Sequence, residues 1–221
     1  MNLPDCCASP PETPAEVRTP TTRRALLIGL AGSALASGLA LAAPDLPHLD
    51  ARDIVLPTDP VMGNLAGDVT LVDFFDLQCP ACHAMEPRIL RLIAADHGLR
   101  SVPVDYPIFG PRSRMGARAL LAAQSFGAYS ALRERLLERK GRLTEDAIQA
   151  AAESLKLDWK KLQALMASPA IEARVDANLA RGKALGIKRL PMMFLGTFRI
   201  PGELHYADML DLLRTVRRQQ K

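Results

Sequence analysis

The sequence predicts an α/β fold that carries an inserted block of helices. Residues 69–75 and 101–106 are short runs with β-branched and aromatic side chains, and an amphipathic helical pattern separates them. Residues 112–187 are rich in Ala, Leu and Arg and poor in Gly and Pro, which is typical of helices. Two more strand-like runs and a helix follow, so the predicted order is strand, helix, strand, helical block, hairpin and helix.

The first half of the predicted sheet consists of two strands joined by a helix. The strand at 69–75 follows a turn signal at 64–67. The helix begins at Pro80 and keeps apolar residues at helical spacing until Gly98 supplies a stop. Because a helix connects the two strands, we expect the strand at 101–106 to run parallel to the first.

Three helix starts are marked inside the helical block. Thr144, Asp158 and Ser168 each precede a helical pattern, and their side chains can accept a hydrogen bond from a free amide of the first turn. Pro169 then stands at a first helical position, and Gly186 ends that helix. The block is therefore expected to contain several short, well-capped helices.

The C-terminal part is expected to return to the sheet. Residues 191–195 and 198–200 predict a pair of strands, and an amphipathic helix follows from residue 206 to about residue 216. Positive charge suits the C-terminal end of a helix. We therefore expect solvent exposure for its basic residues, which are Arg214, Arg217, Arg218 and Lys221.

The first 42 residues have the pattern of a bacterial export signal. Arg23 and Arg24 precede an uncharged run that is rich in Ala, Gly and Leu and ends in Ala-Leu-Ala at 40–42. The adjacent arginines indicate the twin-arginine type, and cleavage is expected after Ala42. The alternative is an uncleaved membrane anchor, because about 19 apolar residues can span a bilayer. The expected parts of the chain are the export segment 1–42, a linker 43–52, the first part of the α/β domain 53–110, the helical insertion 111–187 and the second part 188–221.

Charge and cysteine counts exclude several classes of protein. The 28 Lys and Arg residues are mixed with 24 Asp and Glu residues, and 5% of residues are aromatic, so a nucleic-acid surface is not indicated. Four cysteines are too few for a disulfide-stapled scaffold. Cleavage would remove Cys6 and Cys7, which would leave Cys79 and Cys82 as the only thiols in an oxidising compartment.

The segment Cys79-Pro80-Ala81-Cys82 is the candidate reactive site. Two thiols separated by two residues can switch between dithiol and disulfide within one helical turn. Cys79 stands at a helix N-terminus, where free amides and the helix dipole favour a thiolate, so we expect it to be the exposed, attacking sulfur. Cys82 lies one turn further and is expected to be the buried, resolving sulfur.

Three other interpretations of this segment stay open. A permanent disulfide would close a four-residue loop, which stabilises a fold by only about 2 kcal/mol. A zinc site needs about four ligands, and the sequence after residue 42 offers no second cysteine pair. With His83 the motif also matches the haem-attachment pattern C-x-x-C-H, and Met192 or Met193 would be the axial ligand. We expect neither a metal nor a cofactor, and we expect His83 on the helix surface.

Two segments of the sequence resemble the DsbA-like thiol:disulfide oxidoreductases of the thioredoxin fold. Residues 74–82, Phe-Phe-Asp-Leu-Gln-Cys-Pro-Ala-Cys, resemble the family's strand and active-site signature. Residues 107–110, Pro-Ile-Phe-Gly, resemble the family's segment after the second strand. The resemblance covers about residues 53–216 and includes a helical insertion. It implies a thioredoxin-like fold with an inserted helical domain.

The resemblance also implies roles for individual residues. Asp73 matches the family's buried acid and would accept the proton of Cys82; the alternative is a solvent-facing aspartate on the strand. Pro191 matches the family's cis-proline, which holds substrate beside the cysteines; the alternative is a trans-proline that starts an edge strand. Leu190 stands where relatives carry Thr or Val. The dipeptide between the cysteines is Pro80-Ala81 and contains no histidine, whereas the strongly oxidising members have one there. This difference predicts a less oxidising protein.

Together these features predict a periplasmic oxidoreductase that donates its Cys79–Cys82 disulfide to exported proteins with cysteine thiols. A membrane redox partner is expected to regenerate the disulfide. Because about ten residues separate Ala42 from the expected first strand near Asp53, we expect a monomer without an N-terminal dimerisation segment. The alternatives are a reductase or isomerase of the same fold, or a non-catalytic module that binds an exported partner in its cleft.

Overall fold

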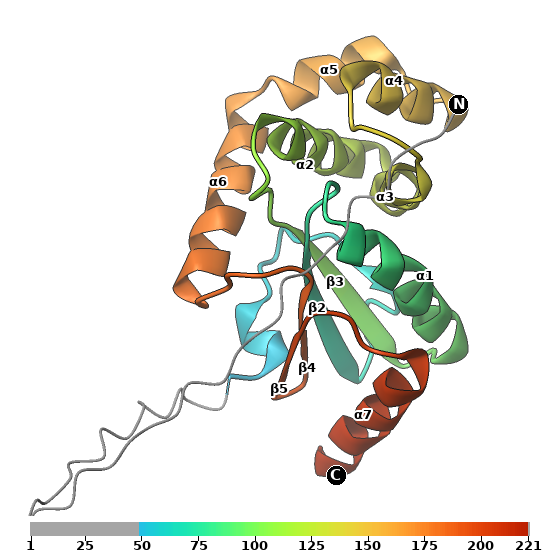
Figure 1. Cartoon of the computed structure of the whole chain (residues 1–221), viewed down its shortest axis with the longest axis vertical. Helices are drawn as coiled ribbons and strands as arrows, with labels where there is room; N and C mark the ends of the chain where they lie inside the picture. Colours follow the sequence, from blue (N-terminus) through green and yellow to red (C-terminus); the bar gives the residue numbers. More distant parts are fainter. Residues whose placement is uncertain (1–48, 221) are drawn as a thin grey trace, which may run out of the picture. The chain divides into compact units, whose positions relative to one another are not determined.

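A five-stranded mixed sheet forms the centre of the protein, whose structure is a computed structural model that describes residues 49–220 (Figure 1). The strand order is β1-β3-β2-β4-β5. The strands are β1 Met62–Gly63, β2 Val69–Phe75, β3 Leu99–Asp105, β4 Met192–Leu195 and β5 Phe198–Pro201. β2 and β3 are parallel, whereas β4 is antiparallel to both β2 and β5. The predicted strands and their directions are thus confirmed, and β1 is an addition.

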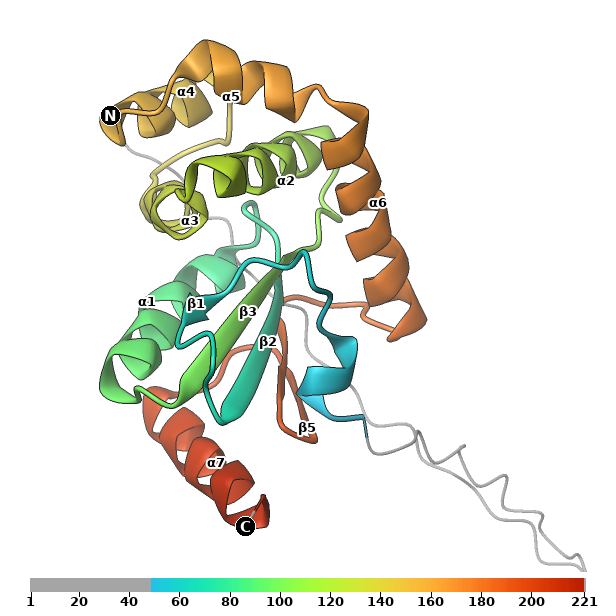
Figure 2. The ribbon, with the colours of Figure 1, turned by 180° about the vertical axis from the view of Figure 1, so that it is seen from behind.

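Helical elements cover both faces of the sheet (Figure 2). The elements outside the insertion are the 3₁₀-helix η1 Ala51–Ile54, α1 Pro80–Ala95 and α7 Tyr206–Gln219. On one face, Leu71 of β2 packs with Met85 of α1 and Met209 of α7. On the other face, Phe74 of β2 packs with residues of η1 and with the segment that follows the last helix of the insertion. All seven residues of β2 are consequently buried.

The helical insertion lies between β3 and β4, and its hydrophobic cluster also includes Phe75, Leu77, Cys79 and Cys82 of the α/β domain. Its elements are α2 Pro111–Ala123, η2 Gln124–Phe126, α3 Tyr129–Glu138, α4 Glu145–Ser154, α5 Trp159–Met166 and α6 Pro169–Ala184. The side chains of Thr144, Asp158 and Ser168 accept backbone amides at the starts of α4, α5 and α6. All three predicted helix starts are therefore confirmed.

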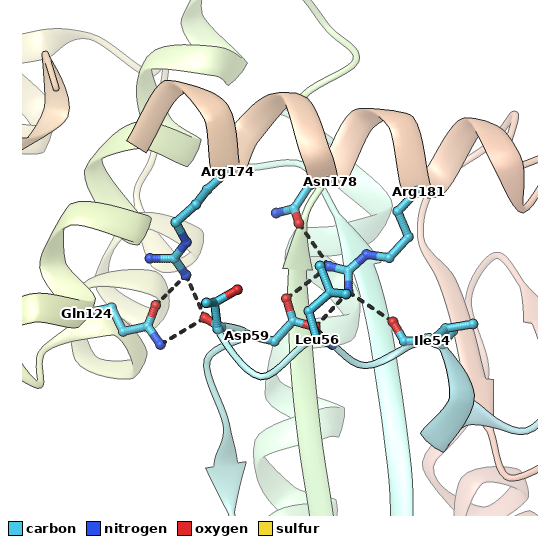
Figure 3. A network of polar contacts seen from close by, with 8 residues as sticks. Ile54, Leu56, Asp59, Gln124, Arg174, Asn178 and Arg181 are labelled. Carbon is cyan, nitrogen blue, oxygen red and sulfur yellow. Dashed lines mark hydrogen bonds and ion pairs between the residues drawn. The ribbon is translucent and has the colours of Figure 1, made fainter. Parts of the chain in front are cut away.

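An arginine of α6 fastens the segment before β1 to the insertion (Figure 3). Arg181 donates to both carboxylate oxygens of Asp59, at 2.6 and 3.0 Å, and to the Ile54 carbonyl at 2.9 Å. The Asn178 side chain accepts a further bond from Arg181 at 2.8 Å. The same network includes Arg174, Gln124 and the carbonyl of Thr58. Residues 54–59, which are distant from α6 in the sequence, are thereby held against it.

Three sequence expectations about the ends of the domain are wrong. The segment near Asp53 is the 3₁₀-helix η1, because Asp50 and Asp53 form a capping box there, and the first strand begins only at Met62. Ala51 is buried and its amide donates to the Gly196 carbonyl at 2.7 Å, so the expected linker 43–52 ends inside the folded part. Arg217 is only partly exposed to solvent. It forms ion pairs with Asp68, just before β2, and with Asp96, at the end of α1, and these pairs join α7 to both segments.

The predicted export segment lies outside the described residues. Among helices of residues 49–220, none combines the length and the apolar character that a membrane crossing requires.

Candidate active site

The cysteine pair lies where β2 gives way to α1. The Asp76 side chain accepts the Gln78 amide at 2.8 Å, and its carbonyl accepts the Cys79 amide at 3.0 Å, which tightens the turn between the two elements. Cys79 is the N-cap residue of α1, Pro80 follows at the first helical position, and the Cys79 carbonyl accepts the Cys82 amide at 3.0 Å. The predicted location of the motif at a helix N-terminus is confirmed.

Both thiols are free, and both are buried. Cys79 is 4% exposed and Cys82 is 3% exposed, so the prediction of an exposed Cys79 is wrong. The cause is the loop before β4. The Cys79 thiol donates a hydrogen bond to the Leu190 carbonyl at 3.7 Å, and this loop therefore covers the sulfur atom.

The two thiols have opposite pKa shifts although their exposed fractions are alike. A hydrogen bond from the Cys82 thiol, together with the backbone amides of Cys82 and Ala81, lowers the pKa of Cys79 to about 7. The same hydrogen bond raises the pKa of Cys82, and burial and the Asp73 carboxylate raise it further. Cys79 is therefore the sulfur that ionises first, as its place at the helix N-terminus predicts.

The other predicted substrate-contact residues lie around Cys79. The Leu190–Pro191 peptide bond is cis and β4 lies between β2 and β5, so the alternative of a trans-proline on an edge strand is wrong. Leu190 is half-buried, Pro80 is exposed and Ala81 is half-buried, whereas Pro191 is buried. The structure thus brings the Leu190 carbonyl, Pro80 and Ala81 together at the reactive sulfur.

The residues of the haem-attachment alternative have other roles in this fold. His83 is half-buried rather than on the helix surface, and its Nε2 lies 2.8 Å from the Leu77 carbonyl. Met192 and Met193 are buried in β4 and pair with Phe74 and Asp73 of β2. Both methionine side chains belong to the hydrophobic core of the sheet.

Asp73 is buried, so the alternative of a solvent-facing aspartate is wrong. Its Oδ2 accepts a hydrogen bond from Arg133 at 2.7 Å, whereas its Oδ1 has no hydrogen-bond partner among the described residues. Burial raises the pKa of Asp73, and the positive charge of Arg133 partly offsets the increase. An acid of this kind can exchange protons closer to neutral pH than an exposed aspartate can.

Arg133, a residue that we did not predict, holds two acids beneath the cysteine pair. Its guanidinium group forms ion pairs with Asp73 of β2 and Glu86 of α1, and it lies 4.3 Å above the ring of Phe75. Arg133 is 1% exposed and comes from α3 of the insertion. Burial raises the pKa of Glu86 to about 6. The insertion therefore supplies the positive charge that the buried acids of the α/β domain need.

The sequence contains a signal for both missed residues. Arg133 stands at helical spacing between the buried leucines 132 and 136, and Glu86 stands between Met85 and Ile89 of a buried stripe. A charged side chain within an apolar stripe is rarely buried unless it is paired. Each position alone predicts a partner, but the spacing does not say which residue the partner is.

A third acid lies in the same buried region. The Tyr129 hydroxyl donates to Asp105 at 2.8 Å, and burial raises the pKa of Asp105 to about 7. Because Tyr129 and Arg133 both lie on α3, this one helix brings a phenol and a guanidinium group to the acids of β2, β3 and α1.

We expect Cys79 of the reduced protein to react with iodoacetamide at a rate that rises with pH and has its midpoint near 7. Cys82→Ala removes the thiol that donates to Cys79, so it should move the midpoint toward the ordinary value of about 8.5. Cys82→Ser keeps a hydroxyl donor and should move it less. An unchanged midpoint in Cys82→Ala would show that the Cys82 thiol is not the main cause of the shift.

The sheet, the inserted helices and the cysteine pair at the start of α1 define a thioredoxin-type fold. The family model described as thioredoxin matches residues 56–214. A thioredoxin-like oxidoreductase from Silicibacter pomeroyi DSS-3 is 32% identical with a TM-score of 0.71, over 75% of this chain and 95% of that one. The thiol-disulfide exchange protein alpha-DsbA2 from Wolbachia pipientis is 22% identical with a TM-score of 0.71, over 75% and 91% of the two chains. This chain therefore belongs to the thioredoxin family.

A longer class of relatives also contains a matching region. The Na(+)/H(+) antiporter NhaA 1 of Salinispora arenicola is 26% identical over 162 residues, which are 71% of this chain and 24% of the antiporter. The chain thus spans about a quarter of the length of the curated relatives it matches.

Proposed function

We propose that this protein is a periplasmic oxidase that transfers the Cys79–Cys82 disulfide to exported proteins. The observation that carries the proposal is the divergence of the two thiol pKa values within one helical turn, with Cys79 at about 7 and Cys82 raised. A substrate thiolate attacks the Cys79 sulfur of the disulfide, the S–S bond breaks, and Cys82 leaves with the electron pair. A second substrate thiolate then attacks the substrate sulfur of the mixed disulfide, and Cys79 leaves as a thiolate.

The lower pKa of Cys79 suits the second of these steps. A thiol of lower pKa is a better leaving group in thiol-disulfide exchange. Release of the oxidised substrate is therefore favoured over a persistent mixed disulfide. The products are a substrate disulfide and the dithiol form of the protein, so the electrons of two substrate thiols end on Cys79 and Cys82.

Asp73 supplies the proton step at Cys82. When Cys82 leaves as a thiolate, its raised pKa makes it a strong base that takes up a proton. The Asp73 carboxyl has a raised pKa, and its Oδ1 has no hydrogen-bond partner within residues 49–220, so it can donate this proton to Cys82 and take it back in the reverse step. Arg133 holds the other carboxylate oxygen in place.

Leu190, Pro191, Pro80 and Ala81 are proposed to hold the substrate backbone. Leu190 and Ala81 are half-buried beside the Cys79 sulfur, and Pro80 is exposed. The Leu190 side chain is apolar and bulkier than Thr or Val, so it should favour apolar substrate residues next to the cysteine. Because the Leu190 carbonyl covers Cys79, substrate must displace or share this contact.

The periplasmic location and the partners are part of the proposal. A similar fold with 22% identity is described as a periplasmic thioredoxin-like protein from Salmonella enterica serovar Typhimurium. The export pattern of residues 1–42 supports the same compartment. We propose a monomer that is reoxidised by a membrane redox partner.

Oxidative refolding of a reduced, unfolded substrate protein tests the direction of transfer. We expect the oxidised protein to accelerate refolding, and we expect glutathione equilibration to give a potential between about −270 and −180 mV, the values of thioredoxin and protein disulfide isomerase. The reason is that a Cys79 pKa of about 7 stabilises the dithiol form less than the pKa of about 3.5 in strongly oxidising members. A potential near about −120 mV, or fast insulin reduction without any gain in refolding, would contradict this proposal.

A further inference from the structure

A hollow of about 350 Å³ lies directly beside the cysteine motif. One side consists of Gln78, Pro80 and His83, and the other side consists of the loop between α3 and α4, with Arg139, Arg142 and Leu143. Helices α1 and α3, which carry these two sides, are neighbours in the fold (Figure 1). Its volume lies at the low end of the range for ligand pockets and is large enough for one or two side chains.

The charges around the hollow are positive. Arg139 and Arg142 line it, and no acidic residue of the described part of the chain does so. Arg139 donates to the carbonyls of Leu77 and Leu136, which are neutral acceptors, and neither arginine forms an ion pair within residues 49–220. Burial lowers the pKa of Arg139, so its charge lies in a partly desolvated site where an anion would be attracted more strongly than in open water.

The nearby acids form no ion pair with these arginines within residues 49–220, although the Asp76 charge stabilises the charged form of Arg139 from a distance. Asp76 is buried, and its carboxylate accepts the amides of Gln78, Ile108 and Phe109. Glu138 borders a different hollow, between α1 and α3, together with Glu86 and Glu134. The positive charge of the hollow is therefore available to a molecule that arrives from outside.

The place of the hollow relative to Cys79 determines what can reach it. Gln78 and Pro80 flank Cys79 in the chain and line the hollow. An extended peptide advances about 3.3–3.6 Å per residue. A residue one or two positions from the substrate cysteine can therefore lie over the neighbours of Cys79 that line the hollow. Exposed Pro80 offers apolar contact to a short aliphatic stem, and the arginines offer donors to a carboxylate beyond it.

We propose that this hollow is a specificity subsite for an acidic side chain next to the reactive cysteine of a protein substrate. The inference rests on the proposed disulfide transfer and adds a substrate preference to it. Glutamate fits best, because its two methylene groups can lie against Pro80 while its carboxylate pairs with Arg139 or Arg142.

Matched peptides test the proposal. Three cysteine peptides carry Glu, Gln or Lys two positions from the cysteine, and the rate of mixed-disulfide formation with the oxidised full-length protein is measured at low and high salt. We expect the Glu peptide to react about fivefold faster than the Gln peptide at low salt, the Lys peptide to react slowest, and the differences to shrink at high salt.

Two variants separate the hollow from the net charge of the protein. Arg142→Gln should bring the ratio of Glu to Gln rates close to one, because Arg142 is exposed on the loop and lines the hollow. Arg135→Gln removes one charge from an exposed position of α3 that does not line the hollow, and it should preserve the ratio. Equal rates for Glu and Gln peptides, or equal loss in both variants, would overturn this inference while disulfide transfer stands. Failure of all three peptides to react would overturn the proposed function itself.

Discussion

Cys79→Ser is expected to reduce disulfide transfer to the rate of the uncatalysed exchange, although the fold is retained. The hydroxyl of serine forms no disulfide, so neither the Cys79–Cys82 bond nor the mixed disulfide with substrate can exist. Serine is nearly isosteric with cysteine and can donate to the Leu190 carbonyl as the thiol does. The measurement is oxidative refolding of a reduced substrate, with circular dichroism to verify folding.

Cys82→Ser provides the matched contrast to this variant. It keeps Cys79, so a substrate that carries an activated disulfide can still form a mixed disulfide with it. Because Cys82 is missing, the active site has no second thiol that resolves that species, and we expect the mixed disulfide to accumulate. A Cys79→Ser protein that retains refolding activity, or a Cys82→Ser protein that traps nothing, would favour the non-catalytic binding module.

Arg133→Met is expected to lower the free energy of unfolding by about 3–5 kcal/mol, the usual cost of removing one partner of a buried ion pair. Methionine preserves much of the side-chain volume but leaves Asp73 and Glu86 buried without a counter-charge. The contact of the guanidinium group with the Phe75 ring is lost as well. Urea unfolding of the reduced protein, followed by circular dichroism, measures the loss.

The loss of stability in Arg133→Met should depend on pH. Burial raises the pKa of Asp73, Glu86 and Asp105, and Arg133 partly offsets each increase. An acid with a higher pKa in the folded state binds more protons when folded. Stability therefore falls as the pH rises from the pKa of the unfolded state to the pKa of the folded state. Removal of Arg133 raises the pKa values of these acids in the folded state, so the pH range over which stability falls extends upward. We therefore expect a greater loss at about pH 8 than at about pH 5.

Two variants control for this result. Arg133→Lys keeps one positive charge but cannot bind both acids with a planar group, so its stability should fall between those of the native protein and Arg133→Met. Arg135→Met changes an exposed arginine of the same helix and should alter stability by less than about 0.5 kcal/mol. If Arg133→Met unfolds at the same urea concentration as the native protein, the three-residue cluster does not stabilise the fold.

Local sequence determined the elements of this protein and the place of its cysteines. Strand β2, helix α1 and the caps at Thr144, Asp158 and Ser168 depend on residues close together in the chain, and these predictions are confirmed. The same holds for Cys79, which becomes an N-cap because a buried strand and a turn precede it. Side-chain pattern and backbone capping are short-range effects, so they can be recognised without the fold.

Only the tertiary structure decided how the site is covered and charged. Cys79 is buried because the Leu190 carbonyl arrives from the loop before β4, more than a hundred residues later. The partner of Asp73 and Glu86 is Arg133 because α3 of the insertion packs on α1. A buried charge predicts some partner, since unpaired burial costs several kcal/mol, roughly as for any ion in a protein interior. Which residue becomes the partner depends on how distant segments pack. The spacing of residues within one helix does not predict that packing.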